Sequence, residues 1–568
     1  MSNTLALKPY IEKIRKHCNN LSKADLTDLL CLIAQEVPVK ERHLFLEKLK
    51  IISIDSPESS FEINEVDEIL SRVNGVIEDI LERQESIEDG SYYEENYEYG
   101  DYYDDESPDG ISEEQKEDIE ALFLEADQLF LAGNSDAAKK VYRELIGLFG
   151  HNSQRELCYE IYHNDIDINW RETLARYCRC VYETSFSNEK VVRMLSVMEV
   201  EQPVFENHYD KSRELLPSLR DIFDAKTGEL DRWHDFLEDF RKELKQKNGN
   251  RAFLLYLETI NWLDGLKEVA SEIRKKKIPV GYLYWLDQLQ ANGSWHELAE
   301  VSQEALANMP LDNLRAYAAG KLSLAGENTK DTSLVLQGKR EQFFSASKEQ
   351  NLVSLLKVSV KQDVKEAELK KVLDFLKLEK EESSWMKNDS FILKIKVLLM
   401  LGNLKEAYSQ IDKETVVGWS YSKQTTGGIY ASILITLTKG NSEAKSIHNL
   451  FNSYIGNKYT SENFIRDEIL KSLSKLTITK SQKEEWFQFI QKIATSRVDH
   501  IVSNKHRKAY ARAAETMGGY MECLILNEQK NKAIDFLNLN RNQKYSRFPA
   551  FRSEVDRVLK SSPLLFHL

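Results

Sequence analysis

The chain is poor in the residues that break helices. Its 568 residues include only 10 prolines and 23 glycines, fewer than an average soluble chain of this length carries. Long stretches without either residue favour helix over sheet. The chain is also too long for one compact core, so we expect two to four domains or one extended repeat array.

Cysteines and long hydrophobic runs are also scarce. The six cysteines are scattered and lack the close, even spacing of a disulfide framework: Cys18, Cys31, Cys158, Cys178, Cys180 and Cys523. The N-terminal residues MSNTLALKPYIEKIRKHC lack the apolar region of a signal peptide, and the longest apolar run, residues 429–437, is too short to span a bilayer. We therefore expect a cytoplasmic protein without a membrane segment.

Positive charge is missing from one part of the chain. No lysine or arginine occurs between Arg83 and Lys116, a range with thirteen Asp and Glu residues. Without these thirteen negative charges, the net charge of −15 becomes about −2 (−15 + 13) for all other residues. This nearly neutral remainder offers no broad basic stripe for phosphates, which argues against nucleic-acid binding.

The acidic range has an unusual centre, SYYEENYEYGDYYDDESPDG at residues 91–110. Dense like charge and few aliphatic residues predict an acidic linker that is disordered when free. Six tyrosines are nevertheless too many for a plain linker, and we predict that they contact a partner: Tyr92, Tyr93, Tyr97, Tyr99, Tyr102 and Tyr103. The alternatives are a solvated linker, docking on a basic partner or on the protein's own groove, and acidic mimicry of a nucleic acid.

What the chain does contain is a recurring helical-hairpin pattern. In residues 118–149, apolar positions at helical spacing flank a Gly133-Asn134 turn, and small alanines at 126, 137 and 138 allow two helices to approach closely. The layout recurs loosely in residues 278–310, 391–411 and 510–542. Such hairpins bury their apolar faces only by stacking on their neighbours.

We therefore predict an all-α fold of tetratricopeptide-like helical-hairpin repeats forming an α-solenoid. The expected divisions are a small N-terminal helical domain, the acidic linker, the repeats, weakly structured joints around a hairpin, and C-terminal helical repeats: residues 1–87, 88–117, 118–376, 377–428 and 429–568. Within the joints, residues 412–432 are expected to form an irregular loop because they contain Gly427-Gly428 and several β-branched residues.

Several phrases resemble a known protein group. They are LARYCRCVYETS (174–185), residues 282–310, LVLQGKREQFFSAS (334–347), HRKAYARAAETM (506–517) and residues 533–559. Together they resemble an uncharacterised bacterial family of degenerate tetratricopeptide-like repeat proteins, similar to the helical part of SWIM zinc-finger proteins. The resemblance implies a helical-repeat fold and carries no agreed activity.

The zinc motif of SWIM proteins is incomplete in this chain. Cys178-Arg179-Cys180 supplies the Cys-x-Cys half, but no Cys-x-His follows it. Two cysteines spaced i,i+2 on a helix point to different faces and chelate one ion poorly. We expect no metal and no cofactor.

A weaker resemblance lies in overall plan. Type III-E CRISPR loci encode a helical protein of similar size that a caspase-like protease cuts at an interdomain loop. That resemblance implies an antiviral-defence role and a cleavage region at the polar joints, with Trp385, Met386, Lys387, Gly427 and Gly428 as the candidates.

Motifs for enzymatic chemistry are missing: the chain has no phosphate-binding glycine loop, GxSxG, HExxH or kinase signature. We therefore expect a non-enzymatic interaction or regulatory module whose partner is a protein, such as a protease or a transcription regulator. Tyr282, Trp285 and Trp295 are candidates to line a peptide groove. The alternative is that Tyr282 and Trp285 pack between hairpins, since they share a helix face.

Overall fold

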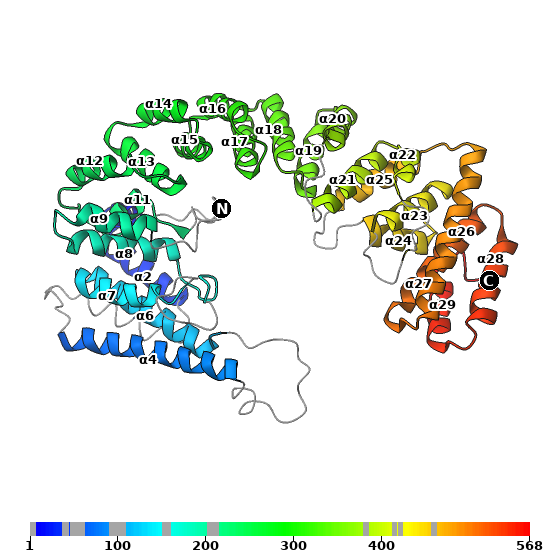
Figure 1. Ribbon diagram of the computed structural model, residues 1–568, viewed down its shortest axis with the longest axis horizontal. Coiled ribbons are helices and arrows are strands. Elements are labelled where there is room, and N and C mark those ends of the chain that lie inside the picture. Colours follow the sequence, from blue (N-terminus) through cyan, green and yellow to red (C-terminus); the bar gives the residue numbers. More distant parts are fainter. Residues whose placement is uncertain are drawn as a thin grey trace. The chain divides into compact units, whose positions relative to one another are not determined.

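The computed structural model describes residues 7–36, 45, 63–89, 110–149, 161–200, 215–378, 386–411, 417, 424–455 and 463–568. These residues form helices joined by turns, with one isolated β-bridge between Phe149 and Ile161 (Figure 1). The predicted all-α class is therefore confirmed for the described residues. Within them, no helix combines the length and the apolar character needed to cross a membrane.

The chain divides into two compact units, Met1–Gln288 (unit 1) and Leu289–Leu568 (unit 2). The division lies inside the range 118–376 that was expected to form a single array of repeats. It also falls within one helix, α15 (Pro279–Ala291).

Unit 1 contains short and medium helices that contact one another mainly in chain order. Before α15 they are α1 (Leu7–Cys18), α2 (Lys23–Glu36), α4 (Ile63–Asp89), α6 (Glu113–Leu131), α7 (Ser135–Ile146), α8 (Trp170–Thr184), α9 (Lys190–Leu195), η2 (Ser196–Val200), α11 (Leu219–Asp224), α12 (Trp233–Leu244), α13 (Asn250–Leu263) and α14 (Leu266–Lys276).

The predicted helical hairpin of residues 118–149 is present as α6 and α7. Ser112 and Gln115 form a capping box at the start of α6, and the Asn134 side chain caps α7. Gly133 has a φ of +91°, the left-handed conformation expected at this turn. The predicted turns at 293, 402 and 527–529 also contain a residue with positive φ: Gly293, Gly402 and Glu528.

Helix α4 packs on α6 and α7, although the acidic segment separates them in the sequence. Arg72 on α4 forms two hydrogen bonds with the Glu125 carboxylate on α6. The buried Gln84 donates a 3.2 Å hydrogen bond to the Gly110 carbonyl, which brings both ends of the acidic segment together. The helix of residues 63–89 therefore belongs to the same packed unit as the first hairpin, whereas the sequence predicted a separate domain.

The short helix α11 is held at both ends by charged side chains from other helices. At its N-terminus, the Leu219 N–H donates a 2.7 Å hydrogen bond to Glu258 on α13. At its C-terminus, the buried Arg179 of α8 donates to the carbonyls of Phe223 (2.8 Å) and Lys226 (2.9 Å). A carboxylate at the N-terminus and a guanidinium at the C-terminus both complement the helix dipole.

Unit 2 contains the remaining helices. They are α16 (Trp295–Asn308), α17 (Asn313–Thr329), α18 (Thr332–Ser345), α19 (Glu349–Lys361), α20 (Lys365–Leu378), α21 (Met386–Met400), α22 (Leu404–Ser409), α23 (Gln424–Leu437), α24 (Lys445–Ile455), α25 (Phe464–Leu473), α26 (Lys480–Ser503), η4 (Arg507–Ala509), α27 (Tyr510–Leu526), α28 (Lys530–Leu537), η5 (Asn538–Lys544) and α29 (Pro549–Ser561).

The C-terminal helices surround a central helix, α27. This helix contacts α23, α24, α26, α28 and α29, and residues on all of its sides are buried. Helices α16 to α20, in contrast, contact mainly their neighbours in the chain. The last part of unit 2 is thus a bundle, and differs from the consecutive stacking expected for residues 429–568.

The prediction of an irregular loop at residues 412–432 is wrong for residues 424–432, which are helical. Helix α23 begins at Gln424, and Gly427 and Gly428 are buried within it. A Cβ atom on Gly427 would lie 2.1 Å from Cε1 of Tyr454, so α23 and α24 approach each other too closely for any side chain there. The two glycines allow close helix packing here, and they do not break the helix.

Replacing Gly427 with alanine should destabilise unit 2 by about 1–3 kcal/mol because the Tyr454 ring or the helix backbone must move. Gly320→Ala is the matched control: its Cβ would have an ordinary contact, 3.7 Å from the Gln342 Nε2 atom, and the higher helix propensity of alanine should be neutral or stabilising. Chemical denaturation of both variants measures the difference. Equal free energies of unfolding would contradict the close approach of α23 and α24.

The stability of unit 1 should depend on the protonation of Glu258. Burial raises the pKa of this carboxyl from 4.5 to about 7. The folded chain then binds this proton more tightly than the unfolded chain. The stabilisation that comes from this tighter proton binding is complete below about pH 4.5 and is lost as the pH rises through about 7. The stability of wild type relative to Glu258→Gln should therefore fall between these pH values, measured by thermal unfolding. The exposed Glu268→Gln is the control, and a pH-independent difference for Glu258→Gln would contradict the prediction.

Candidate partner-binding groove on helix α29

The structure places the sequence-predicted aromatic residues in different environments. Tyr282 and Trp285 on α15 are 0% and 1% exposed, so their side chains belong to the core and cannot line an open groove. Trp295 is partly buried at the start of α16. The six tyrosines, Tyr92, Tyr93, Tyr97, Tyr99, Tyr102 and Tyr103, lie outside the described residues.

The candidate cleavage residues do not share one loop. Trp385 lies outside the described residues, and Met386 and Lys387 are the first residues of α21. Gly427 and Gly428 are buried inside α23, so a protease would reach them only after this helix unfolds.

Cys178 and Cys180 are both buried on α8. Burial raises the pKa of the Cys180 thiol, which disfavours the thiolate that a metal ligand requires.

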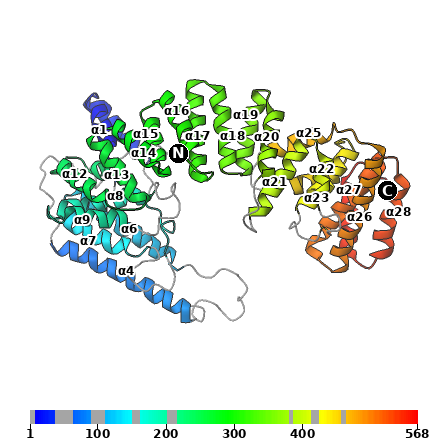
Figure 2. The same ribbon diagram turned by 45° about the horizontal axis from the view of Figure 1, so that its top comes forward.

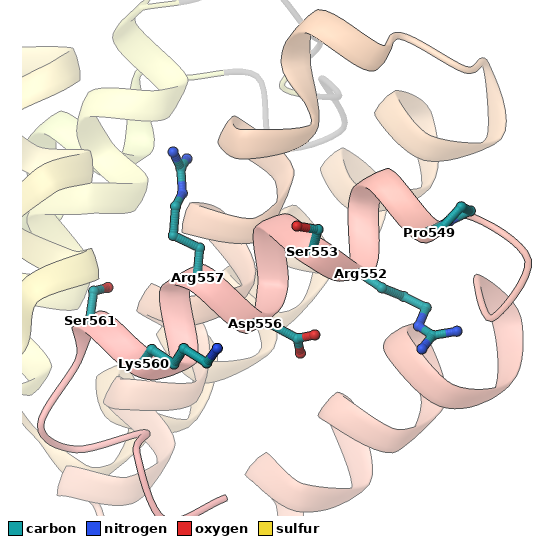
Figure 3. A pocket seen from close by; sticks show the side chains of 7 residues that line it. All are labelled: Pro549, Arg552, Ser553, Asp556, Arg557, Lys560 and Ser561. Atoms are coloured by element: carbon teal, nitrogen blue, oxygen red, sulfur yellow. The ribbon is translucent and has the colours of Figure 1, made fainter.

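A groove that the sequence did not predict lies along α29. It has a volume of about 620 Å³ and is lined by seven residues of this one helix: Pro549, Arg552, Ser553, Asp556, Arg557, Lys560 and Ser561 (Figure 3). Their spacing of three and four residues places them in one stripe along the helix. Three of the seven side chains are cationic and only Asp556 is anionic.

The opposite stripe of α29 fixes the helix in the bundle. Phe551, Val555 and Val558 are buried, and the Phe551 ring lies edge-on to Tyr510 with centroids 5.9 Å apart. Pro549 occupies the first turn, where a missing N–H costs no helical hydrogen bond. Because this apolar stripe is buried, the polar stripe faces outward.

A buried carboxylate ties the C-terminal end of α29 to the bundle. Glu522 on α27 is 0% exposed, and it accepts hydrogen bonds from the N–H groups of Ser446 (3.1 Å) and Ile447 (3.0 Å) and from the Ser562 hydroxyl (2.6 Å). The first two donors belong to the start of α24, and Ser562 follows the last residue of α29. One side chain therefore joins three helices, while burial raises the pKa of its carboxyl.

Arg541 of η5 and Asp556 of α29 form a bridge at the groove. The Nε and Nη2 atoms of Arg541 donate hydrogen bonds of 2.7 and 2.9 Å to the two carboxylate oxygens of Asp556. This bidentate geometry neutralises the one acidic side chain of the lining. The remaining charged side chains of the lining are therefore all cationic.

The three cations of the lining have different surroundings. Arg557 pairs with Glu554 at 2.5 Å, whereas Arg552 donates a 3.3 Å hydrogen bond to the Ser546 carbonyl, a neutral group. Lys560 is exposed one turn beyond Asp556. Figure 3 shows the Arg557 and Lys560 side chains extending in different directions from α29, so the two cations do not converge on one point.

Chemically, this arrangement suits anionic groups. Arginine and lysine form charge-assisted hydrogen bonds with carboxylates and phosphates, and the Ser553 hydroxyl adds a further donor. The sequence signal was present as basic and hydroxyl residues at helical spacing in RSEVDRVLKS. The outward stripe can be identified only when the buried stripe of α29 is known, because polar residues occur on more than one side of this helix.

Comparison of the chain with known protein families, with curated proteins and with solved structures finds no match. The family and CRISPR resemblances stated from the sequence therefore stay predictions.

Glu522→Gln should destabilise unit 2 by about 1–3 kcal/mol. Glutamine has one acceptor oxygen for three donors, and its NH2 group would face a backbone N–H. Hydrogen exchange should also rise in the last turn of α29, which the Ser562 bond holds. Glu515→Gln is the control, since glutamine can still accept the 3.1 Å hydrogen bond from Asn449. Equal exchange in both variants would show that Glu522 does not hold α29.

Proposed function

We propose that this protein is a non-enzymatic helical-repeat interaction module and that the α29 groove binds an acidic segment of a partner protein. The observation that carries the proposal is the outward stripe of Arg552, Arg557 and Lys560 on a chain of net charge −15. Recognition of acidic motifs by arginine clusters is a recurring mode of peptide binding.

The length of α29 fits a short extended peptide as the ligand. A helix of 13 residues such as α29 is about 20 Å long, which matches about six residues of an extended peptide. The Ser553 hydroxyl can donate to or accept from peptide backbone groups, whereas the Ser561 hydroxyl, which donates a 3.0 Å hydrogen bond to the Val558 carbonyl, can accept from them.

The same features disfavour a nucleic acid as the ligand. A nucleic-acid site needs several cations that follow a phosphate backbone. The α29 stripe instead offers three cations on a single helix. Outside the acidic segment the chain is nearly neutral.

The stacked hairpins support the wider role of an interaction scaffold. In unit 1 successive helices bury their apolar faces against one another, and in unit 2 helices α16 to α20 do the same. Arrays of this kind present long rigid surfaces made of many helices, and binding to peptides and proteins is their usual use.

The double variant Arg552→Glu/Lys560→Glu should bind a fluorescein-labelled glutamate-rich peptide at least about tenfold more weakly than the wild type, a loss of about 1.4 kcal/mol. Both side chains are exposed, so the fold should be unaffected. Fluorescence anisotropy at two salt concentrations measures the affinity, and wild-type binding should weaken at high salt because exposed charges are screened.

Lys530→Glu/Lys532→Glu is the matched control: it makes the same change of charge at exposed positions of α28 in the same unit. Equal loss of affinity in both double variants would contradict a site on α29. Tighter binding of a single-stranded oligonucleotide than of the peptide to the wild type would overturn the choice of ligand.

A further inference from the structure

Unit 1 contains a cluster of aromatic side chains around α11 and α12. It joins rings from four helices, α8, α11, α12 and α13: Tyr182, Phe223, Trp233, Phe236, Phe240 and Trp262. Phe223 and Trp262 form its partly exposed edge, with ring centroids 5.1 Å apart in an edge-to-face arrangement. The faces of such rings carry negative potential and attract cations.

Two cations already lie on this edge. The Lys8 Nζ atom lies 4.4 Å from the centroid of the Phe223 ring, and the Arg220 guanidinium lies 5.8 Å from it. The same guanidinium lies 5.4 Å from the Trp262 ring. The edge therefore accommodates both an ammonium and a guanidinium group.

The element that carries this edge is fixed. Helix α11 bears Arg220 and Phe223, and Glu258 and Arg179 hold its two ends from α13 and α8. The same helix contributes the buried carboxylate of Asp224, which is 2% exposed. The Asp224 Oδ2 atom accepts a 2.6 Å hydrogen bond from Arg220, while Oδ1 has no hydrogen-bond partner among the described residues. This carboxylate therefore holds the Arg220 guanidinium that lies on the two rings.

Lys8 belongs to helix α1, which packs weakly on the rest of unit 1. Helix α1, dark blue in Figure 2, contacts α11, but its apolar side chains Tyr10 and Ile14 are 51% and 39% exposed. Lys8 itself is partly buried. The contact of α1 with the rest of unit 1 includes the cation–π interaction of Lys8, a kind worth about 0.5–2 kcal/mol.

We propose that the Phe223–Trp262 edge is a binding site for a lysine or arginine side chain of a protein partner, and that Lys8 occupies this site within the chain until the partner displaces it. The rigid α11 supplies the site, and the weakly held α1 supplies an exchangeable occupant. The proposal concerns unit 1 and a cationic ligand, so it is independent of the acidic peptide proposed for α29.

The test uses a fluorescein-labelled synthetic peptide with the α1 sequence LKPYIEKIRKHC and the full-length protein. Lys8→Gln should free the part of the Phe223 ring that Lys8 covers, with Arg220 still in place, and should increase the affinity for the peptide about fivefold or more relative to the wild type. Lys13→Gln is the matched control, an exposed lysine on the same helix, and should leave the affinity unchanged. A peptide with glutamine in place of its first lysine should bind the Lys8→Gln protein as weakly as the unmodified peptide binds the wild type.

Adding Phe223→Leu to Lys8→Gln removes the ring that Lys8 contacts and should abolish the gain in affinity, with thermal unfolding as the check on folding. Equal affinities of the Lys8→Gln and Lys13→Gln proteins would overturn the proposal. Binding of the glutamine-containing peptide as tightly as the unmodified one would also overturn it, because the site would then recognise the apolar face of the peptide. Neither comparison requires a change in the core.

Discussion

Close approach between helices is the constraint on which the rest of the packing depends. Without a sheet in the described residues, each helix can bury its apolar stripe only against other helices. Small residues stand where the backbones come nearest: a Cβ on Gly338 would lie 2.5 Å from the Ser323 backbone nitrogen, and one on Gly427 would overlap the Tyr454 ring. Alanines 126, 137 and 138 are buried on α6 and α7, which contact each other. Such interfaces tolerate little added volume because protein interiors are already close-packed.

The carboxylates that this packing encloses are used to fix helix ends. Glu258 accepts the N–H of Leu219 at the start of α11, and Glu522 accepts two N–H groups at the start of α24. Both sites place a carboxyl group at the positive end of a helix dipole, where backbone N–H groups offset part of the cost of its desolvation. Glu258 also holds α11, which bears the partly exposed Phe223 ring, and Glu522 holds α29, which bears the cationic stripe, through Ser562. Rigid supports of this kind limit the conformational entropy that binding would otherwise cost.

The two surfaces favour opposite charges. The α29 stripe presents cations that suit carboxylates, while the Phe223–Trp262 edge presents ring faces that suit an ammonium or guanidinium group. A protein that displays both would be suited to holding partners, or segments of partners, of different charge. This pattern agrees with an interaction module and gives each unit a separate contribution to it.

The acidic tyrosine-rich segment also belongs to unit 1, since Gln84 and Gly110 bring its two ends together.

The sequence by itself determined the all-helical class, the hairpin of α6 and α7, and its left-handed turn at Gly133, because these follow from local propensity, periodicity and capping. One of its two alternatives for Tyr282 and Trp285 was that they share a helix face and pack between hairpins. Both side chains do lie in the core. Only the tertiary structure decided that α4 packs across the acidic segment, that Gly427 lies inside a helix, and that α27 is central. It alone showed which polar stripe of α29 faces outward and that Lys8 lies on the Phe223 ring. These features depend on contacts between residues far apart in the chain, such as Gln84 with Gly110 and Glu522 with Ser562, and no local pattern encodes such contacts.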